Sequence, residues 1–212
     1  MTQLTQPLRF ESIQEICRYI SKITGVQLGE RQESMVSSRL QRRALDLKLA
    51  GIEEYYPYFQ RNITSETKAL VSLLTTHHSF FFREITHFQF LAQTGLGNII
   101  EAVRGRGDKQ IWVWSAACSR GQESYSLAMF LSHHLERMAP DLSFEILGTD
   151  VDEQSVSIAR NGVYHRNEIK AVPMQYLGDH WVRGSGDIAD YVKARNSLKE
   201  HCRFQQRQKQ FR

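Results

Sequence analysis

The 212-residue sequence has few of the residues that hold disulfide-rich domains or metal sites together. Its three cysteines, Cys17, Cys118 and Cys202, are far apart and form neither a CxxC pair nor a Cys/His cluster. Adjacent His77 and His78 point apart on any regular backbone and have no third ligand nearby, so we expect no metal site. Free thiols fit a reducing compartment, which makes a cytoplasmic protein the default interpretation.

Long hydrophobic runs are also missing. No segment approaches the roughly 18 consecutive apolar residues of a membrane span, and the first ten residues lack the apolar centre of a signal peptide. We therefore expect no direct membrane insertion. The 41% of hydrophobic residues is nevertheless enough for a buried core, which excludes a wholly disordered chain.

The excess of basic residues is small and local. The chain has 27 Lys and Arg against 23 Asp and Glu, a net charge of +4. From residue 199 onward there are five basic residues and one acid, 5 − 1 = +4, so the first 198 residues are neutral. Because this charge lies in a C-terminal tail, we expect no nucleic-acid partner.

Apolar residues at three- and four-residue spacing between residues 10 and 77 predict a helical N-terminal domain. The predicted helices are Ile13–Ile23, Val36–Leu47, a third that begins at Gly51, and Thr64–Leu74. On the second helix Arg39, Arg42 and Arg43 share an arc that could meet an acidic partner. The alternative is a solvated helix face.

After Arg83 the pattern changes to alternating strands and helices. The apolar run Ile111–Trp114 predicts a buried strand, small residues follow it, and Gln122–Met138 has helical spacing. A second strand, Phe144–Leu147, is followed by a helix over Glu153–Arg160. This alternation is typical of an open parallel sheet, and we expect the domain boundary between residues 75 and 85.

The turn after the first strand, residues 116–121, has the small side chains that let a ligand approach the backbone. The helix that follows presents unpaired N–H groups and the positive end of its dipole. A nucleotide-like cofactor is one interpretation. The other is structural, because Ser119 and Gln122 have capping-box spacing.

Asp150, at the end of the second strand, is placed to accept hydrogen bonds from the ribose hydroxyls of an adenosine. The alternative makes Asp150 the N-cap of the following helix, a role for which Asp152 competes.

A third cluster, residues 75–84, combines polar groups, three phenylalanines and Arg83, which can form a bidentate contact with a carboxylate.

Three stretches carry a resemblance to a known family. TTHHSFFFRE, WSAACSRGQESYSLAM and GTDVDEQSVSIARNGVY resemble the CheR family of chemotaxis methyltransferases, where they commonly read TTNxTxFFRE, WSAAxSTGEEPYSLAM and ATDID..vL..Ar.G.Y. The resemblance implies a helical N-terminal domain, 1–78, and a Rossmann-like S-adenosylmethionine-dependent methyltransferase domain, 79–212, with a small β-hairpin insertion at about 178–198. It also implies methyl transfer from S-adenosyl-L-methionine to glutamates of bacterial chemoreceptors, with S-adenosyl-L-homocysteine as product.

By position, the resemblance assigns roles to particular residues of this chain. The implied cofactor contacts are His77, Ser79, Arg83, Gly121, Glu123 and Asp150, with Arg83 also orienting the substrate carboxylate as the catalytic residue. The implied receptor contacts are Arg39, Arg42 and Arg43 on the second helix and Arg183 and Lys193 in the hairpin, which would face methyl-accepting receptor helices or a receptor tail.

The sequence also departs from the family pattern. His77 replaces Asn, Ser79 replaces Thr, Arg120 replaces Thr, Gln122 replaces Glu, and Ser124 replaces Pro. Arg120 and Gln122 make the cofactor turn more positive, which would not favour a cationic sulfonium. The sequence also ends before the family's later strands, which predicts an incomplete sheet. A second hypothesis is therefore a catalytically impaired relative that binds S-adenosylhomocysteine or a partner helix as a docking module.

Overall fold

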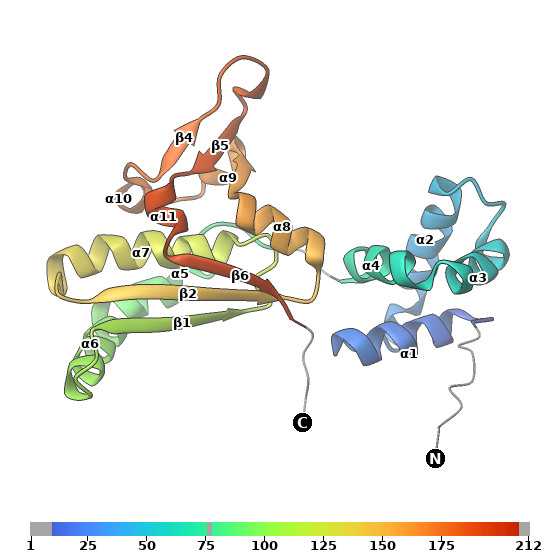
Figure 1. The fold of residues 1–212 in the computed structure, drawn as a ribbon, viewed down its shortest axis with the longest axis horizontal. Helices are drawn as coiled ribbons and strands as arrows, with labels where there is room; N and C mark the ends of the chain where they lie inside the picture. Colours follow the sequence, from blue (N-terminus) through green and yellow to red (C-terminus); the bar gives the residue numbers. More distant parts are fainter. Residues whose placement is uncertain (1–9, 76–77, 208–212) are drawn as a thin grey trace. The chain divides into compact units, whose positions relative to one another are not determined.

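A computed structural model describes residues 10–75 and 78–207 of the chain (Figure 1). The described residues divide into two compact units, 10–75 and 78–207. The first contains only helices and the second contains strands and helices. We call them the helical unit and the α/β unit, and each has its own buried residues.

The helical unit has the four helices that the apolar spacing predicts. They are α1 (Ile13–Thr24), α2 (Glu30–Asp46), α3 (Ile52–Arg61) and α4 (Ile63–Leu74). Ser12 and Glu15 form a capping box at the start of α1, and Gly25 ends that helix in a left-handed conformation. Ile20, Leu40 and Leu70 are fully buried, so the predicted apolar stripes do face one core.

The main sheet of the α/β unit is parallel and has the strand order β1-β2-β6 among the described residues. The strands are β1 (Gln110–Ala116), β2 (Ser143–Asp150) and β6 (Cys202–Gln206), and the helices between the first two and after β2 are α7 (Gln122–Met138) and α8 (Glu153–Asn161). Ala116 pairs with Thr149, so β1 and β2 end side by side. The turn after β1 therefore lies next to Asp150.

One face of β1 is buried and the other is not. Ile111 is buried, while Trp112 and Trp114 are 67% and 70% exposed. The apolar run thus correctly predicts a strand, but its interpretation as a buried strand is wrong for alternate residues. Side chains alternate between the two faces of a sheet. The connection from β1 to β2 contains α7 and the connection from β2 to β6 contains α8, and right-handed crossovers in this order place both helices on the same face.

Three further helical segments precede β1, and the sequence analysis predicted none of them. They are α5 (Ile85–Phe90), the π-helical segment η1 (Leu91–Gly95) and α6 (Leu96–Gly105). Leu96, Ile100 and Val103 join the core of the α/β unit. Leu96, Ile100 and Val103 do have the four- and three-residue spacing of a helix, so this helix could have been predicted from the sequence.

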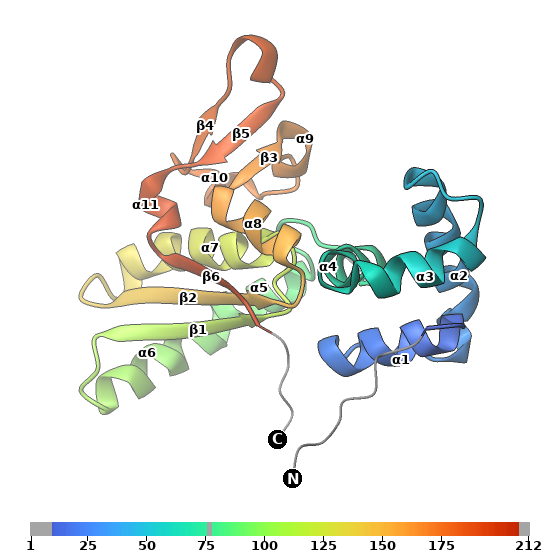
Figure 2. The same cartoon turned by 45° about the vertical axis from the view of Figure 1, so that its right-hand side comes forward.

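A second, antiparallel sheet has the order β3-β5-β4 and projects beyond α8 in Figures 1 and 2. Its strands are β3 (Val163–His165), β4 (Trp181–Arg183) and β5 (Tyr191–Ala194). The short helical segments before, between and after them are α9 (Arg166–Ile169), α10 (Met174–Leu177), the 3-10 segment η2 (Gly186–Ile188) and α11 (Asn196–Lys199). β4 and β5 form the predicted hairpin, and β3 is an additional strand beside it.

Residues 202–206 belong to the basic C-terminal segment of the sequence and form a strand. These residues form β6, which pairs with β2 from Ile146 to Asp150. Phe204 is buried against the core, and Arg203 forms an ion pair with Glu145 at 2.6 Å. β2 is therefore flanked by a strand on each side.

Candidate cofactor site

The turn between β1 and α7, residues 116–121, has a constrained backbone. Ala117, Ser119 and Gly121 all have positive φ angles, at 57°, 52° and 86°. For Ala and Ser this conformation is uncommon and costs free energy, so the surrounding contacts must hold it. The N–H of Cys118 donates to the carbonyl of Thr149 at 3.0 Å, which fastens the turn to the end of β2.

Asp150 is the second anchor of this turn. Its carboxylate is buried and accepts hydrogen bonds from the N–H groups of Ser119 at 2.7 Å and Asp152 at 2.9 Å. Asp152 itself caps α8 by accepting from Gln154 and Ser155. The interpretation of Asp150 as the helix cap is therefore wrong. Each carboxylate oxygen can accept a further bond, so Asp150 keeps capacity for hydroxyl donors.

The start of α7 contains buried polar atoms that are unpaired. Among the described residues, Ser119 Oγ, Gln122 Oε1 and Ser124 Oγ have no hydrogen-bond partner. The N-cap of α7 is Gly121 without a side-chain cap, so the predicted Ser119–Gln122 capping box is wrong. Buried polar atoms without partners are rare and point to a missing polar ligand. Of these residues Ser119 lies beside Asp150, to which its N–H donates, and the turn therefore fits a polar group such as the predicted adenosine.

Gly121 is required by local structure. Its φ of 86° favours glycine, and an added Cβ would lie 2.8 Å from Cβ of Ala159. The residue thus lets α7 and α8 approach each other closely. Its predicted contact with a cofactor stays a prediction beside this structural role.

Glu123 lies in the first turn of α7, with an exposed side chain. Its Oε1 accepts a hydrogen bond from Oγ of Ser115 at 3.0 Å. Ser115 belongs to β1, so this bond holds the Glu123 carboxylate at the carboxyl end of the strand. Ser115 is a residue of the site that the sequence analysis missed, because only the fold shows that it faces α7.

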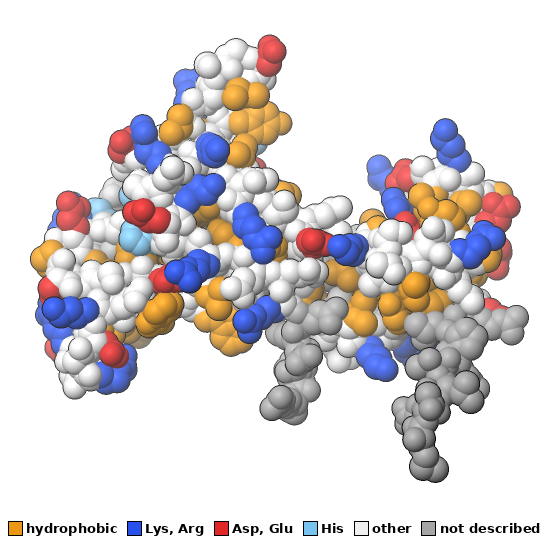
Figure 3. Space-filling view, in the orientation of Figure 1, with side chains coloured by type: hydrophobic (Ala, Val, Ile, Leu, Met, Phe, Trp, Pro, Cys, Tyr) orange, Lys and Arg blue, Asp and Glu red, His pale blue; other side chains and the backbone are white. Residues whose placement is uncertain are grey.

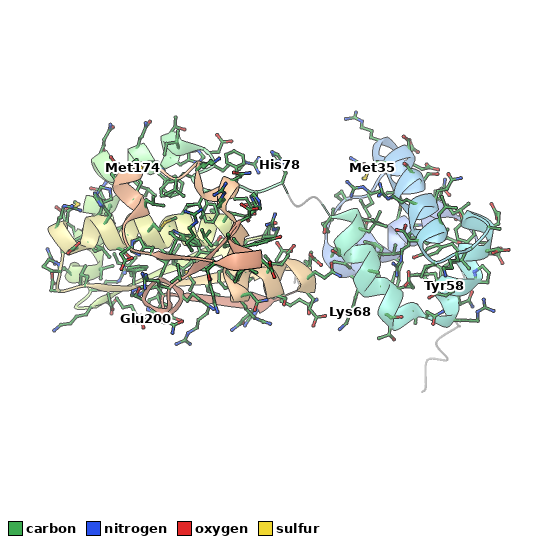
Figure 4. The ribbon with its side chains drawn as sticks, turned by 90° about the horizontal axis from the view of Figure 1, so that it is seen from above. Met35, Tyr58, Lys68, His78, Met174 and Glu200 are labelled. Atoms are coloured by element: carbon green, nitrogen blue, oxygen red, sulfur yellow. The ribbon has the colours of Figure 1, made fainter. Side chains whose placement is uncertain are left out.

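The segment 78–84 packs against the same helix. The N–H of Phe82 donates to Oγ of Ser126 at 2.9 Å, and the Phe82 ring stacks on Tyr176 of α10 with centroids 5.0 Å apart. Figure 4 accordingly shows His78 and Met174 along one edge of the α/β unit, opposite Glu200. Phe82 and Glu84 both have positive φ angles, so this segment is also constrained.

Within that segment Arg83 is exposed, and its guanidinium donates to the carbonyl of His78 at 2.7 Å. Ser79 is half-buried. His77, the remaining predicted contact of this segment, lies outside the described residues. The fold thus fixes the backbone beside Arg83 through Phe82 while the guanidinium remains accessible to an acidic ligand.

Another residue that the sequence analysis missed is Glu168 of α9. Its carboxylate contacts the side chains of Arg120 at 3.0 Å and Gln122 at 3.1 Å, on either side of Gly121. The contact spans 46 to 48 residues, so no local pattern could reveal it. The available signal was the complementary charge of Arg120.

The predicted receptor contacts on α2 differ from one another. Arg43 forms a bidentate ion pair with the buried Glu66, at 3.1 Å and 2.6 Å, and Arg39 donates to the carbonyl of Leu73 at 2.5 Å. Both guanidinium groups therefore have partners within the helical unit, and their contact with a receptor stays a prediction. Arg42 is exposed.

The two basic residues of the hairpin point in opposite directions. Val182 pairs with Lys193, and Arg183 pairs with Val192. Paired residues share a face and neighbours alternate, so Arg183 and Lys193 lie on opposite faces of the small sheet. Their predicted contact with a receptor tail stays a prediction. Figure 3 shows hydrophobic side chains on this projection, where Val182, Ile188 and Tyr191 are exposed.

Cys118 lies in the cofactor turn but is unsuited to be a nucleophile. Burial, with the nearby charge of Asp150, raises the pKa of its thiol to about 12, so the thiol stays protonated at neutral pH. Within 10–75 and 78–207 no group of three or more His, Cys, Asp or Glu side chains could hold a metal ion. In the same ranges no helix is long and apolar enough to cross a membrane.

Comparisons with known proteins agree with this arrangement. A family model described as "CheR methyltransferase, SAM binding domain" matches residues 77–209, and one described as "CheR methyltransferase, all-alpha domain" matches residues 11–75. The chemotaxis protein methyltransferase of Salmonella typhimurium is 33% identical over 207 residues, which cover 96% of this chain and 68% of that protein. The protein of the same description from Escherichia coli is 32% identical with the same coverage. Chemotaxis protein methyltransferase 2 of Pseudomonas aeruginosa is 30% identical over 196 residues, 92% of this chain and 67% of that protein.

Proposed function

This chain belongs to the CheR methyltransferase family, and we propose that it transfers a methyl group from S-adenosyl-L-methionine to glutamate side chains of bacterial chemoreceptors. The observation that carries the proposal is the buried Asp150 carboxylate, which holds the strained cofactor turn through the N–H of Ser119 at 2.7 Å. An acid at the end of β2 beside the turn after β1 is the arrangement that binds adenosine ribose in such sheets.

The residues around the turn fit the parts of this cofactor. Asp150 would accept hydrogen bonds from the ribose hydroxyls, while Ser119 and Gln122 offer unpaired buried polar atoms. Glu123, held by Ser115, would bind the cationic amino group of the methionine portion. His77, Ser79 and Arg83 are proposed contacts from the neighbouring segment.

The reaction needs little acid–base chemistry from the chain. The bound cofactor would supply an electrophilic methyl group: as a carboxylate oxygen bonds to the methyl carbon, the carbon–sulfur bond breaks and the sulfur leaves as the neutral thioether of S-adenosylhomocysteine. A substrate glutamate with a pKa near 4.3 is already ionised at neutral pH, so no strong general base is required. The chain's own task is to align the substrate carboxylate and exclude water, and the accessible guanidinium of Arg83 is suited to orient that carboxylate.

The receptor surfaces are proposals of the same kind. Among Arg39, Arg42 and Arg43, Arg42 is the exposed residue and can meet an acidic receptor helix. On the antiparallel sheet, only one of Arg183 and Lys193 can contact a receptor segment that lies on a single face. The exposed hydrophobic side chains of the hairpin offer additional contact area to such a segment.

Calorimetric titration with S-adenosylhomocysteine tests the cofactor site. Wild-type protein is expected to bind one equivalent, and Asp150→Asn to bind about tenfold more weakly or worse, because hydrogen bonds to a charged acceptor contribute about 1.5–3 kcal/mol. Asp187→Asn is the control, since Asp187 is exposed in the hairpin. A folded wild-type protein that gives no heat, or an Asp150→Asn variant that binds equally well, would contradict the assignment.

A further inference from the structure

Glu168 links α9 to both sides of the cofactor turn. Its Oε1 accepts from the Arg120 guanidinium at 3.0 Å, and its Oε2 accepts from the side-chain amide of Gln122 at 3.1 Å. The N–H of His165 donates to the same carboxylate at 3.2 Å. One carboxylate therefore connects the antiparallel sheet to the residues that flank Gly121.

Other bonds make this connection rigid. The hydroxyl of Tyr164, a buried residue of β3, donates to the carbonyl of Arg120 at 2.6 Å. The N–H of the preceding residue, Ser119, donates to Asp150. Asp150 therefore holds the turn to the parallel sheet, and Glu168 and Tyr164 hold it to the region of the antiparallel sheet. The Arg120 side chain is paired with Glu168.

The charge of Arg120 gives the contact a chemical consequence. The turn lies at the N-terminus of the 17-residue helix α7, where the helix dipole is positive, and Arg120 adds a full positive charge. S-adenosylmethionine carries a sulfonium charge that S-adenosylhomocysteine lacks. An unpaired Arg120 would therefore disfavour the methyl donor more than the product.

We propose that Glu168 is a positioning residue that holds Arg120 and Gln122 and offsets the charge of Arg120, so that the site retains the methyl donor relative to the product. This inference rests on the proposed function of the turn as the S-adenosylmethionine site. The side chains of Arg120 and Glu168 are 34% and 26% exposed, so the pair is partly shielded from solvent and its charges are screened less than those of a fully exposed pair.

The test compares the dissociation constants of S-adenosylmethionine and S-adenosylhomocysteine by calorimetry at low salt. In Glu168→Gln the ratio of the donor's constant to the product's constant should rise about fivefold, the size expected for one uncompensated charge near the ligand. The increase should shrink at high salt. Arg120→Gln leaves Glu168 uncompensated, so the same ratio should fall instead.

Two further proteins complete the design. The double variant Arg120→Gln/Glu168→Gln removes both charges and should return the ratio to near the wild-type value. Glu101→Gln, at an exposed position of α6, should leave the ratio unchanged. Circular dichroism reports whether each protein is folded, and the opposite signs of the two single variants keep the test informative if one of them is unstable.

Several outcomes would overturn the inference. An unchanged ratio, or equal weakening of both ligands, would mean that Glu168 serves only the local structure. Equal tightening of both ligands in Glu168→Gln would mean that a freed Arg120 binds the ligand carboxylate. If the wild-type protein binds neither ligand, the proposed function itself fails. If the wild-type protein binds both ligands and the variants have the same ratio of dissociation constants, only the inference about Glu168 fails.

Discussion

Glu66 is a buried acid whose three hydrogen bonds join α2, α3 and α4. It is 3% exposed and accepts from Arg43 and from the hydroxyl of Tyr55 at 2.9 Å. Burial and the charge of Glu66 raise the pKa of Tyr55, so this hydroxyl remains a donor at neutral pH. The network fixes the relative position of the three helices in the helical unit.

We predict that Glu66→Gln lowers the free energy of unfolding by about 3 kcal/mol, because removing one partner leaves a desolvated charge without its counterion. Part of the Arg43 side chain is exposed, which places the effect at the low end of the range for buried pairs. Urea denaturation followed by circular dichroism measures it. Glu53→Gln, an exposed change on α3, should stay within about 0.5 kcal/mol of wild type.

A loss in Glu66→Gln no larger than in Glu53→Gln would mean that the network contributes nothing to stability.

The same residues show a limit of sequence reasoning. Spacing correctly places Arg39, Arg42 and Arg43 on one side of α2, but the partner of Arg43 lies 23 residues away. Only the packing of α4 on α2 brings Glu66 to it.

At the scale of elements, the junction of β1 and α7 depends on Gly121. We predict that Gly121→Ala lowers the free energy of unfolding by about 2 kcal/mol or more, because alanine disfavours the positive φ and its Cβ would overlap Ala159. Binding of S-adenosylhomocysteine should weaken in the same variant, since the turn must shift. Thermal or urea unfolding, with a titration of the folded protein, measures both effects.

Gly97→Ala provides the matched control within the same unit. Gly97 lies in α6, and an added Cβ would meet nothing within 4 Å. Alanine has the higher helix propensity, so this variant should be neutral or more stable by up to about 1 kcal/mol. Equal destabilisation by the two substitutions would show that the strain at Gly121 has been overestimated.

The elements differ in how well the sequence predicts them. The predicted helix over Gln122–Met138 has the observed bounds of α7, because a long apolar spacing follows a turn of small residues. β6 escaped prediction because its strand CRFQQ has one buried residue, Phe204. Its pairing with β2 supplies what its own hydrophobicity does not, and such pairing across more than 50 residues leaves no local pattern.

The candidate site was predictable to a similar degree. Asp150 and the turn 116–121 could be selected because each comes at the end of a strand that the sequence predicts. The distribution of hydrogen bonds could not, so the competition between Asp150 and Asp152 for the helix cap and the role of Ser119 needed the structure. Glu168 and Ser115 depend on contacts between distant elements, which a single sequence does not encode in its spacing.

At the scale of the whole molecule, the net charge of +4 does not form one basic surface at the C-terminal end of the chain. Arg203, one of the tail residues, is paired with Glu145 in the sheet. Figure 3 shows Lys and Arg side chains spread over this face of the α/β unit with acidic side chains among them. The balance of charge therefore gives no single basic surface in this view, and the proposed receptor contacts rest on individual residues such as Arg42.

Glutamate methylation is tested most directly by transfer of label from methyl-labelled S-adenosylmethionine to a chemoreceptor cytoplasmic fragment. Glutamyl methyl esters hydrolyse in alkali, so the label that the whole chain transfers should be released as methanol. A receptor fragment whose accepting glutamates are replaced by alanine should take up no such label. The proposal predicts alkali-labile label on glutamate that is strongly reduced in Asp150→Asn. Absence of this label from a receptor fragment incubated with protein that binds S-adenosylhomocysteine, or label that resists alkali, would contradict it.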